Sequence, residues 1–239
     1  MKRAAVFVEG QTEAIFIKRL LEEMAGEHAI VFSRERKHAG LYIIEAVSVA
    51  RGQKYEVLIV DCCTDNQVLS SIIERYPSLE GAGYELIVGV RDLYPQPAAS
   101  LPVVQAAIAP HLPVGAAVVF MAIAVQEVEA WFLQEETHFA KVDPALTSAS
   151  IKSATGYDIH NDLSEEVAHP AGLLNDIYRI AGKAYRKTKK HVERTVDALD
   201  YHHLYLARRP VLDSLDALLL QLDNFLAAPK TISPGPSPS

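Results

Sequence analysis

The chain has 239 residues, of which 49% are hydrophobic and 22% are charged, and its formal net charge is −7. This length and apolar content predict one α/β core with a helical addition rather than two large domains. The negative charge argues against a protein that binds nucleic acid over its whole surface, but it allows a local basic patch. The longest apolar run, residues 114–125, is shorter than the ~18 residues that a membrane-spanning helix needs.

Cysteine content and the first segment exclude further classes of protein. The only cysteines, Cys62 and Cys63, are neighbours and therefore poorly placed for a disulfide, which excludes a disulfide scaffold and a zinc ribbon. Residues 1–9 begin like a signal peptide, but the apolar part is short, ends in Glu9 and lacks a small-residue cleavage site. We therefore expect a buried first strand and a cytoplasmic protein without membrane contact.

Short apolar segments rich in β-branched residues alternate with helical patterns in the first part of the chain. Helices are expected from Thr12, as N-cap, to about Ala25, and at 68–75, where Pro77 should end the helix, 101–109 and 126–134. A basic loop is expected at 34–40. Strands are expected at 3–8, 29–33, 41–49, 55–61, 84–92 and 116–125. This alternation predicts a mostly parallel sheet covered on both faces.

After about Asp143 the pattern predicts helices only, near 171–182, 188–206 and 211–226. We therefore expect an α/β domain at 1–142, a helical C-terminal region at 143–228, and a disordered tail rich in proline and serine at 229–239.

Acidic residues follow the expected strands where each strand ends. These residues are Glu9, Asp61, Asp92, and the pair Glu127 and Glu129. In a parallel sheet these ends lie on one edge, where carboxylates repel each other unless a cation joins them. Their hard oxygen atoms suit Mg²⁺ or Mn²⁺. The ordinary alternative is a helix cap or a first-turn residue, and we favour it for Asp61, because residues 64–66 indicate a turn.

The segment Val6-Phe7-Val8-Glu9-Gly10-Gln11-Thr12-Glu13 resembles the opening strand of TOPRIM (topoisomerase–primase) domains. It is most similar to small bacterial TOPRIM-like proteins related to the nuclease half of the overcoming-lysogenization-defect (OLD) family, where a strand ends in Glu-Gly-x-Thr-Glu before a helix. The resemblance continues through 91–95, 127–133, His169-Pro170, Tyr178, Tyr185 and Lys187, and so covers about residues 3–226.

The resemblance implies a Rossmann-like TOPRIM fold in which the first glutamate is a general acid/base or metal ligand and an Asp-x-Asp pair holds Mg²⁺. By position, Glu9 matches the glutamate and Asp92 the first aspartate, whereas Tyr94 replaces the second. Either Glu127 or Glu129 supplies the missing ligand, or the site is inactive. In an extended segment these two glutamates point to one side, but on a helix they diverge by about 200°.

A basic cluster precedes the last helices. It comprises Lys183, Arg186, Lys187, Lys189, Lys190 and Arg194. It can contact a nucleic-acid backbone, although a solvated helix face explains most of its members better. Lys187 is the exception, because the resemblance singles out a Tyr-x-Lys pattern. We expect Trp131 to anchor the core, and His202-His203 to lie at the surface because no cysteine or acid stands at zinc-like spacing.

The leading hypothesis is a Mg²⁺-dependent phosphodiesterase, a TOPRIM-type nuclease of a phage-defence or stress module, with DNA favoured over RNA. Its catalytic residues would be Glu9, Asp92 and Lys187, and its metal ligands Glu9, Asp92, Glu127 and Glu129. The alternative is a degenerate TOPRIM module that binds nucleic acid or a partner ATPase, such as the resemblance implies. A generic nucleotide-binding Rossmann protein is disfavoured, because no Gly-x-Gly-x-x-Gly follows the first strand.

Overall fold

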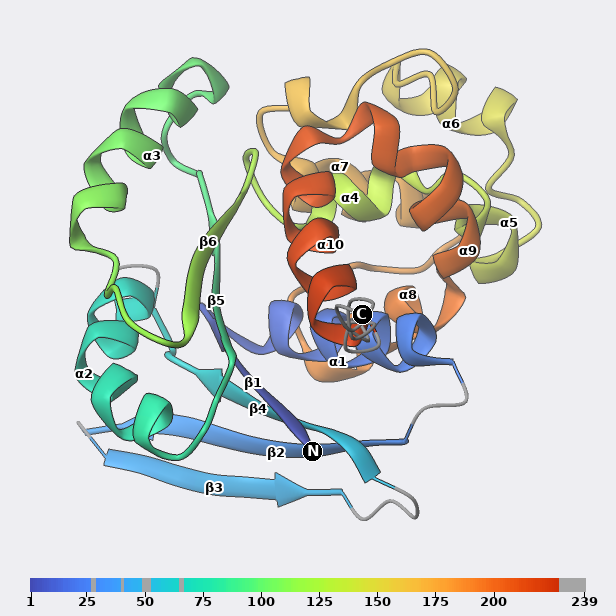
Figure 1. Ribbon diagram of the computed structural model, residues 1–239. Helices are drawn as coiled ribbons and strands as arrows, with labels where there is room; N and C mark the ends of the chain where they lie inside the picture. The colour runs from blue at the N-terminus through green and yellow to red at the C-terminus, as the bar shows by residue number, and fades with distance from the viewer. Residues whose placement is uncertain (27–28, 40, 49–52, 65–66, 228–239) are drawn as a thin grey trace, which may run out of the picture.

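A computed structural model of the chain describes residues 1–26, 29–39, 41–48, 53–64 and 67–227. Its six strands form one sheet in the order β3-β2-β4-β1-β5-β6 (Figure 1). All neighbouring strands are parallel except β3, which is antiparallel to β2. The strands are β1 (Lys2–Val8), β2 (Ala29–His38), β3 (Leu41–Val47), β4 (Gln53–Asp61), β5 (Leu86–Asp92) and β6 (Val118–Ala124). The predicted α/β class with a mostly parallel sheet is confirmed.

Helices cover both faces of this sheet. The helices are α1 (Gln11–Ala25), α2 (Val68–Gly81), α3 (Leu101–Ile108), α4 (Glu129–Gln134), α5 (His138–Val142), α6 (Ser148–Thr155), α7 (Pro170–Ile180), α8 (Lys189–Ala198), α9 (Tyr201–His203) and α10 (Asp213–Leu226). A π-helical turn, Leu204–Arg208, follows α9. No helix in the described part of the chain is long and apolar enough to cross a membrane.

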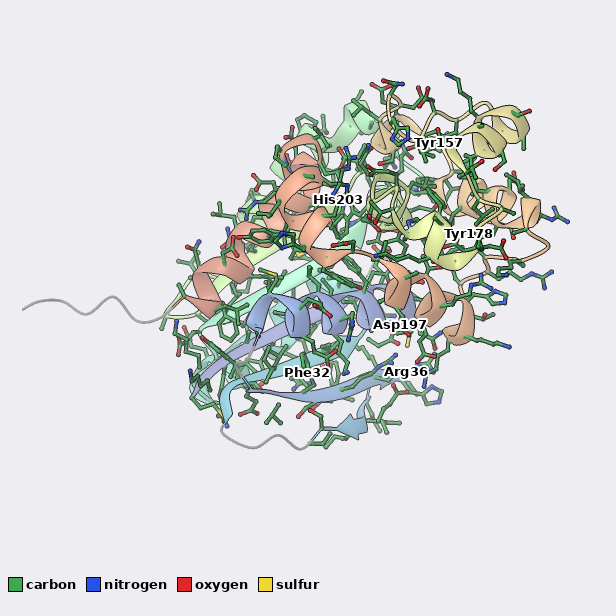
Figure 2. The ribbon with its side chains drawn as sticks, turned by 90° about the vertical axis from the view of Figure 1, so that its right-hand side faces the viewer. Phe32, Arg36, Tyr157, Tyr178, Asp197 and His203 are labelled. Atoms are coloured by element: carbon green, nitrogen blue, oxygen red, sulfur yellow. The ribbon has the colours of Figure 1, made fainter. Side chains whose placement is uncertain are left out.

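The two faces of the sheet have separate hydrophobic cores. Along β1, Ala4, Val6 and Val8 pack into one core and Ala5 and Phe7 into the other, as the two-residue period of a strand requires. The second core lies under α2 and α3. The first joins the sheet to α1 and to the helices after β6, and Figures 1 and 2 show these helices on the same side of the sheet as α1. The residues between 143 and 226 thus share their core with the α/β part.

Strand register brings the carboxyl ends of the central strands together. Val8, the last residue of β1, lies beside Asp61 of β4 on one side and Val90 of β5 on the other. Asp92, the last residue of β5, lies beside Ala124 of β6. The segments that follow β1, β5 and β6 therefore meet at one edge of the sheet, as expected for a parallel arrangement.

Two predicted boundaries are wrong. Residues 34–38, expected in a basic loop, continue β2, because their backbone pairs with β3 and, as far as Arg36, also with β4 on the other side. Helix α2 does not stop before Pro77 but continues to Gly81. Pro77 is exposed, so water can reach the carbonyl left without its N–H partner, while buried Tyr76 and Leu79 hold the last turn on the sheet.

Three other expectations also change. Thr12 is buried inside α1 and does not cap it; the helix begins after Gly10 without a side-chain cap. The predicted helix 126–134 begins at Glu129, because Gln126 has a φ of 63° that interrupts a helix. The predicted helix 188–206 divides at Leu199 and Asp200 into α8 and α9. The tail expected at 229–239 lies outside the described residues.

Candidate metal centre

Three carboxylates meet at the carboxyl edge of the sheet. Asp92 ends β5, Glu127 lies in the turn after β6, and Glu129 begins α4. One oxygen atom from each lies within 4.8 Å of the others. The left-handed conformation of Gln126 turns the chain between β6 and α4. Both glutamates therefore reach the cluster, which is the outcome that an extended segment allows and a continuous helix does not.

Each carboxylate uses one oxygen atom to hold its own orientation. The donors are the Val128 N–H to Asp92 Oδ1 (3.0 Å), the Ala171 N–H to Glu127 Oε2 (2.9 Å) and the Tyr185 hydroxyl to Glu129 Oε1 (2.7 Å). These donors come from the turn before α4, from α7 and from the loop before α8. The second oxygen of each carboxylate remains to face a common point.

A single ammonium group lies at that point. Lys187 Nζ is 3.0 Å from Glu127 Oε1, 3.2 Å from Glu129 Oε2 and 3.8 Å from Asp92 Oδ2. These are the oxygen atoms that do not accept the three hydrogen bonds above. The carboxylate side chains are between 0% and 14% exposed, whereas the Lys187 side chain is 42% exposed. The lysine therefore approaches from the solvent side and covers the three buried carboxylates of Asp92, Glu127 and Glu129, which together form the acidic centre.

Glu9 lies beside this cluster. It follows β1 directly, and its Oε1 is 3.8 Å from Arg91 Nε. A hollow of about 320 Å³ is bordered by Glu9, Glu13, Asp92, Glu127 and Lys187. The predicted residues Glu9, Asp92, Glu127, Glu129 and Lys187 thus lie in one region of the fold.

Glu13 is a residue of this region that the sequence analysis did not select. It is 4% exposed, although it lies in the first turn of an amphipathic helix, where acids usually face solvent. The helix begins at Gln11, immediately after the Glu9-Gly10 turn, so its first turn faces the hollow. The available signal was the second acid of the Glu-Gly-x-Thr-Glu segment, which lies four positions after Glu9 at the start of the predicted helix.

The buried carboxyl groups have abnormal acidities. Burial, together with the negative charge of Glu129, raises the pKa of Glu13 to about 7. Burial and the charges of Glu13 and Glu129 raise the pKa of Asp92 well above its usual range, and burial also raises the pKa of Glu129. Burial alone would lower the pKa of Lys187, but the surrounding carboxylates raise it instead. The centre therefore holds more carboxyl groups than one lysine can keep ionised.

Two other strand-end residues behave differently. Tyr94, where the resemblance would place an aspartate, is 41% exposed; it borders the hollow, and its ring packs edge-on against His169 with centroids 5.5 Å apart. Asp61 borders a separate hollow. Its carboxylate accepts the Cys63 N–H at 3.0 Å and pairs with Arg34 at 3.1 Å, which agrees with the turn interpretation.

The basic cluster predicted near α8 does not act as a unit. Lys183 pairs with Asp143 at 2.7 Å, and Lys189 pairs with Glu193 at 3.7 Å. Arg194 lies over the ring of Tyr178, 5.0 Å from its centroid. Arg186 and Lys190 are exposed. Of the six residues, only Lys187 has a recorded ion pair with the acidic centre.

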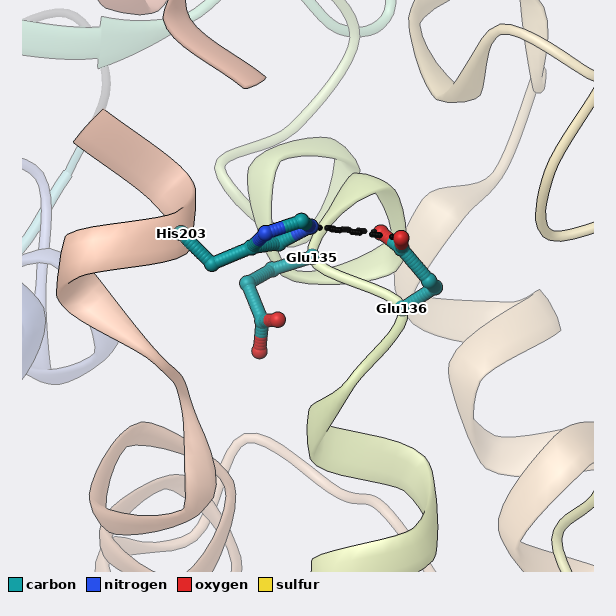
Figure 3. Close-up of side chains that lie close together, drawn as sticks. All are labelled: Glu135, Glu136 and His203. Carbon is teal, nitrogen blue, oxygen red and sulfur yellow. Dashed lines mark hydrogen bonds and ion pairs between the residues drawn. The ribbon is translucent and has the colours of Figure 1, made fainter. Parts of the chain in front are cut away.

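His203, expected at the surface, is only partly exposed and lies beside a second group of acids. Glu135, Glu136 and His203 each offer an atom within 4.8 Å of the others (Figure 3). However, Arg208 also binds Glu136, whose carboxylate is 3.2 Å from His203 Nε2. Burial opposes ionisation of Glu136, but the hydrogen bond from Arg208 lowers its pKa overall.

Glu135 in this second group is also satisfied. It accepts hydrogen bonds from the Thr137 N–H and hydroxyl group and from the Asp200 N–H. Because Arg208 and these donors already balance the carboxylates, we interpret the group as a structural salt bridge. The predicted core role of Trp131 is confirmed: its side chain is fully buried and donates to Ser214 Oγ at 2.8 Å.

Comparison of the chain with protein-family models, with curated proteins and with solved structures gives no match in any of the three. The function must therefore be argued from the acidic centre itself.

Proposed function

We propose that the chain is a Mg²⁺- or Mn²⁺-dependent phosphodiesterase of TOPRIM type that cleaves nucleic acid, with DNA favoured over RNA. The observation that carries the proposal is the convergence of three oriented carboxylates, Asp92, Glu127 and Glu129, beside Glu9 at the carboxyl edge of a parallel sheet. This is the edge at which α/β proteins bind ligands. The sequence resemblance to TOPRIM-like nucleases supports the same assignment.

The donor set fits a hard divalent cation. Carboxylate oxygens are the ligands that Mg²⁺ and Mn²⁺ prefer, and the centre includes neither cysteine nor histidine among its described ligands. Bonds of about 2.1 Å place neighbouring ligands about 3 Å apart, so the carboxylates would draw in slightly from their present spacing. A bound divalent ion would polarise a phosphodiester and stabilise charge on its oxygen atoms.

The remaining residues have complementary tasks. Glu9 faces the hollow and would accept a proton from the attacking water. Lys187 would neutralise charge on the phosphate, and the exposed Arg186 and Lys190 nearby would contact the backbone without reading sequence. In this proposal, residues 1–142 form the TOPRIM domain, 143–228 its helical extension, and the protein acts in the cytoplasm within a phage-defence or stress module.

A second candidate is a degenerate TOPRIM module that binds nucleic acid or a partner ATPase. It is favoured by Tyr94 at the position of the second aspartate and by Lys187, which already neutralises part of the cluster. The ATPase partner rests on the sequence resemblance alone.

Nicking of supercoiled plasmid by the purified protein in Mg²⁺ or Mn²⁺, compared with Glu9→Gln, tests the proposal. Metal-dependent nicking that is lost in the variant supports the nuclease. Absence of nicking by the wild-type protein favours the degenerate module, and equal nicking by both proteins indicates a contaminant.

A further inference from the structure

We propose that Lys187 is a resident counter-ion whose ammonium group occupies the position of the divalent cation, so that the metal ion enters by displacing it. The displaced ammonium then faces the adjoining hollow, where the scissile phosphate binds. This inference rests on the proposed function, because it concerns how the same centre exchanges one cation for another.

The geometry of the oxygen atoms carries the argument. In each carboxylate, one oxygen accepts a hydrogen bond from the protein, and the other points at Lys187 Nζ. Three anchored carboxylates that offer one oxygen each to a single point form a cation site, whichever cation is present. The lysine reaches this point at 3.0–3.8 Å, the range of ammonium–carboxylate contacts rather than of metal bonds.

The charge of the centre explains why the two cations compete. Asp92, Glu127 and Glu129 carry three negative charges when ionised, and one ammonium leaves most of that charge unbalanced. A divalent ion balances it better. However, an ion bound to the same three oxygen atoms would lie a few ångströms from the ammonium, and at the edge of a buried cluster two like charges this close repel each other strongly. One of the two cations must therefore leave.

The structure lets the lysine move without unfolding its loop. Tyr185, two residues earlier, is 3% exposed, and its N–H donates to Asn175 Oδ1 at 3.2 Å while its hydroxyl holds Glu129. This anchor fixes the backbone. The Lys187 side chain is 42% exposed and borders the hollow, and its four-carbon stem is flexible. Rotation of the side chain alone transfers the ammonium from the carboxylates to the hollow beside Glu9.

Mn²⁺ affinity, measured by titration calorimetry, tests the exchange. Lys187→Met keeps most of the stem but removes the charge, and we expect it to bind Mn²⁺ at least about tenfold more tightly than the wild type. Lys187→Arg keeps the charge and should bind no more tightly than the wild type. Lys183→Met removes a charge from the same loop outside the cluster and should leave the affinity unchanged. A purely structural lysine would not raise affinity when removed.

A second readout uses the wild-type protein, in case Lys187→Met does not fold. The rate of reductive methylation of Lys187, followed by mass spectrometry, should rise when Mn²⁺ is added, because the ammonium loses its three carboxylate partners. Equal Mn²⁺ affinity in wild type and Lys187→Met, or an unchanged methylation rate at saturating Mn²⁺, overturns the exchange but leaves the metal centre standing. No Mn²⁺ binding by either protein overturns both proposals.

Discussion

Two groups of acids lie in the interior of the described part of the chain, and they differ in how their charge is balanced. Around Glu136, Arg208 provides a cation and His203 a further side-chain contact, and the Thr137 and Asp200 N–H groups satisfy Glu135. Around Asp92, three carboxylates share the ammonium of Lys187, and Glu9 and Glu13 add further acids at the same hollow. The pKa of Glu136 is lowered, whereas burial raises the pKa of Asp92, Glu129 and Glu13.

Under the proposed function, this difference distinguishes an acid cluster that stabilises the fold from one that binds a cation. A balanced cluster gains stability from its ion pairs, whereas an unbalanced one reduces stability until a cation arrives. Perturbed acidity alone occurs in both kinds of site. The direction of the shift, together with the number of available cations, distinguishes them here.

The largest expected difference between the two groups is in catalysis. Asp92→Asn should lower metal-dependent nicking by at least about 100-fold, because it removes a charge that would hold the ion. The amide oxygen can still accept the Val128 N–H, so the fold should survive. His203→Gln changes the balanced group, which comprises Glu135, Glu136, His203 and Arg208, and should retain the wild-type rate of nicking. Initial rates in Mn²⁺ measure both, and an active Asp92→Asn would remove the acidic centre from the mechanism.

The second prediction concerns the stability of metal-free protein as pH changes. The folded-state pKa of Glu13 is raised from 4.5 to about 7, so its contribution to stability is fully present below pH 4.5 and is lost as pH rises to about 7. In Glu13→Gln the side chain stays neutral, so the variant should lose ~3 kcal/mol less stability between pH 4.5 and 8 than the wild-type protein does. Urea unfolding in chelator measures the difference.

Glu22→Gln is the control for this prediction. Glu22 lies on the same helix, but its side chain is 36% exposed and pairs with Lys18. The unfolding free energy of Glu22→Gln should change with pH as that of the wild-type protein does. If Glu13→Gln also follows that profile, Glu13 is not part of the unbalanced cluster.

The sequence predicts where the acidic centre lies better than it predicts which residues form it. Glu9 and Asp92 follow apolar strands, and parallel strands align their carboxyl ends, so pattern alone brings these two residues to one edge. Whether Glu127 and Glu129 both reach it depends on the left-handed turn at Gln126, which no local preference of glutamine predicts. The presence of Glu13 in this region depends on where α1 begins: because the helix begins at Gln11, its first turn faces the hollow.

The balanced group lies beyond sequence reasoning for another reason. Glu136 and His203 are 67 positions apart and meet only because α9 packs beside the segment after α4. The prediction of a basic loop after β2 is wrong for a similar reason, because pairing with neighbouring strands outweighs the basic composition of this segment. Local pattern is sufficient where one strand or helix determines the outcome, but not where two distant segments must meet.

The third prediction tests the balanced group by removing its cation. Arg208→Met leaves Glu136, whose side chain is 11% exposed, with His203 as its recorded side-chain partner, and should reduce the unfolding free energy by ~2 kcal/mol. Lys18→Met breaks an exposed pair and should cost less than ~0.5 kcal/mol. Denaturant unfolding at neutral pH measures both. A loss for Arg208→Met no larger than that of the control would show that this group contributes little.

The smallest expected effect is stabilisation by metal, and it decides which group binds the ion. At a free Mn²⁺ concentration ten times the dissociation constant, binding should add about 1.4 kcal/mol to the unfolding free energy. For a chain of this size, that corresponds to an increase in Tm of about 3–5 °C. The shift should disappear in Asp92→Asn and persist in Glu136→Gln, since the latter changes only the balanced group. The opposite pattern, a shift lost in Glu136→Gln and kept in Asp92→Asn, would place the ion beside His203 and leave Lys187 as the permanent cation of the acidic centre.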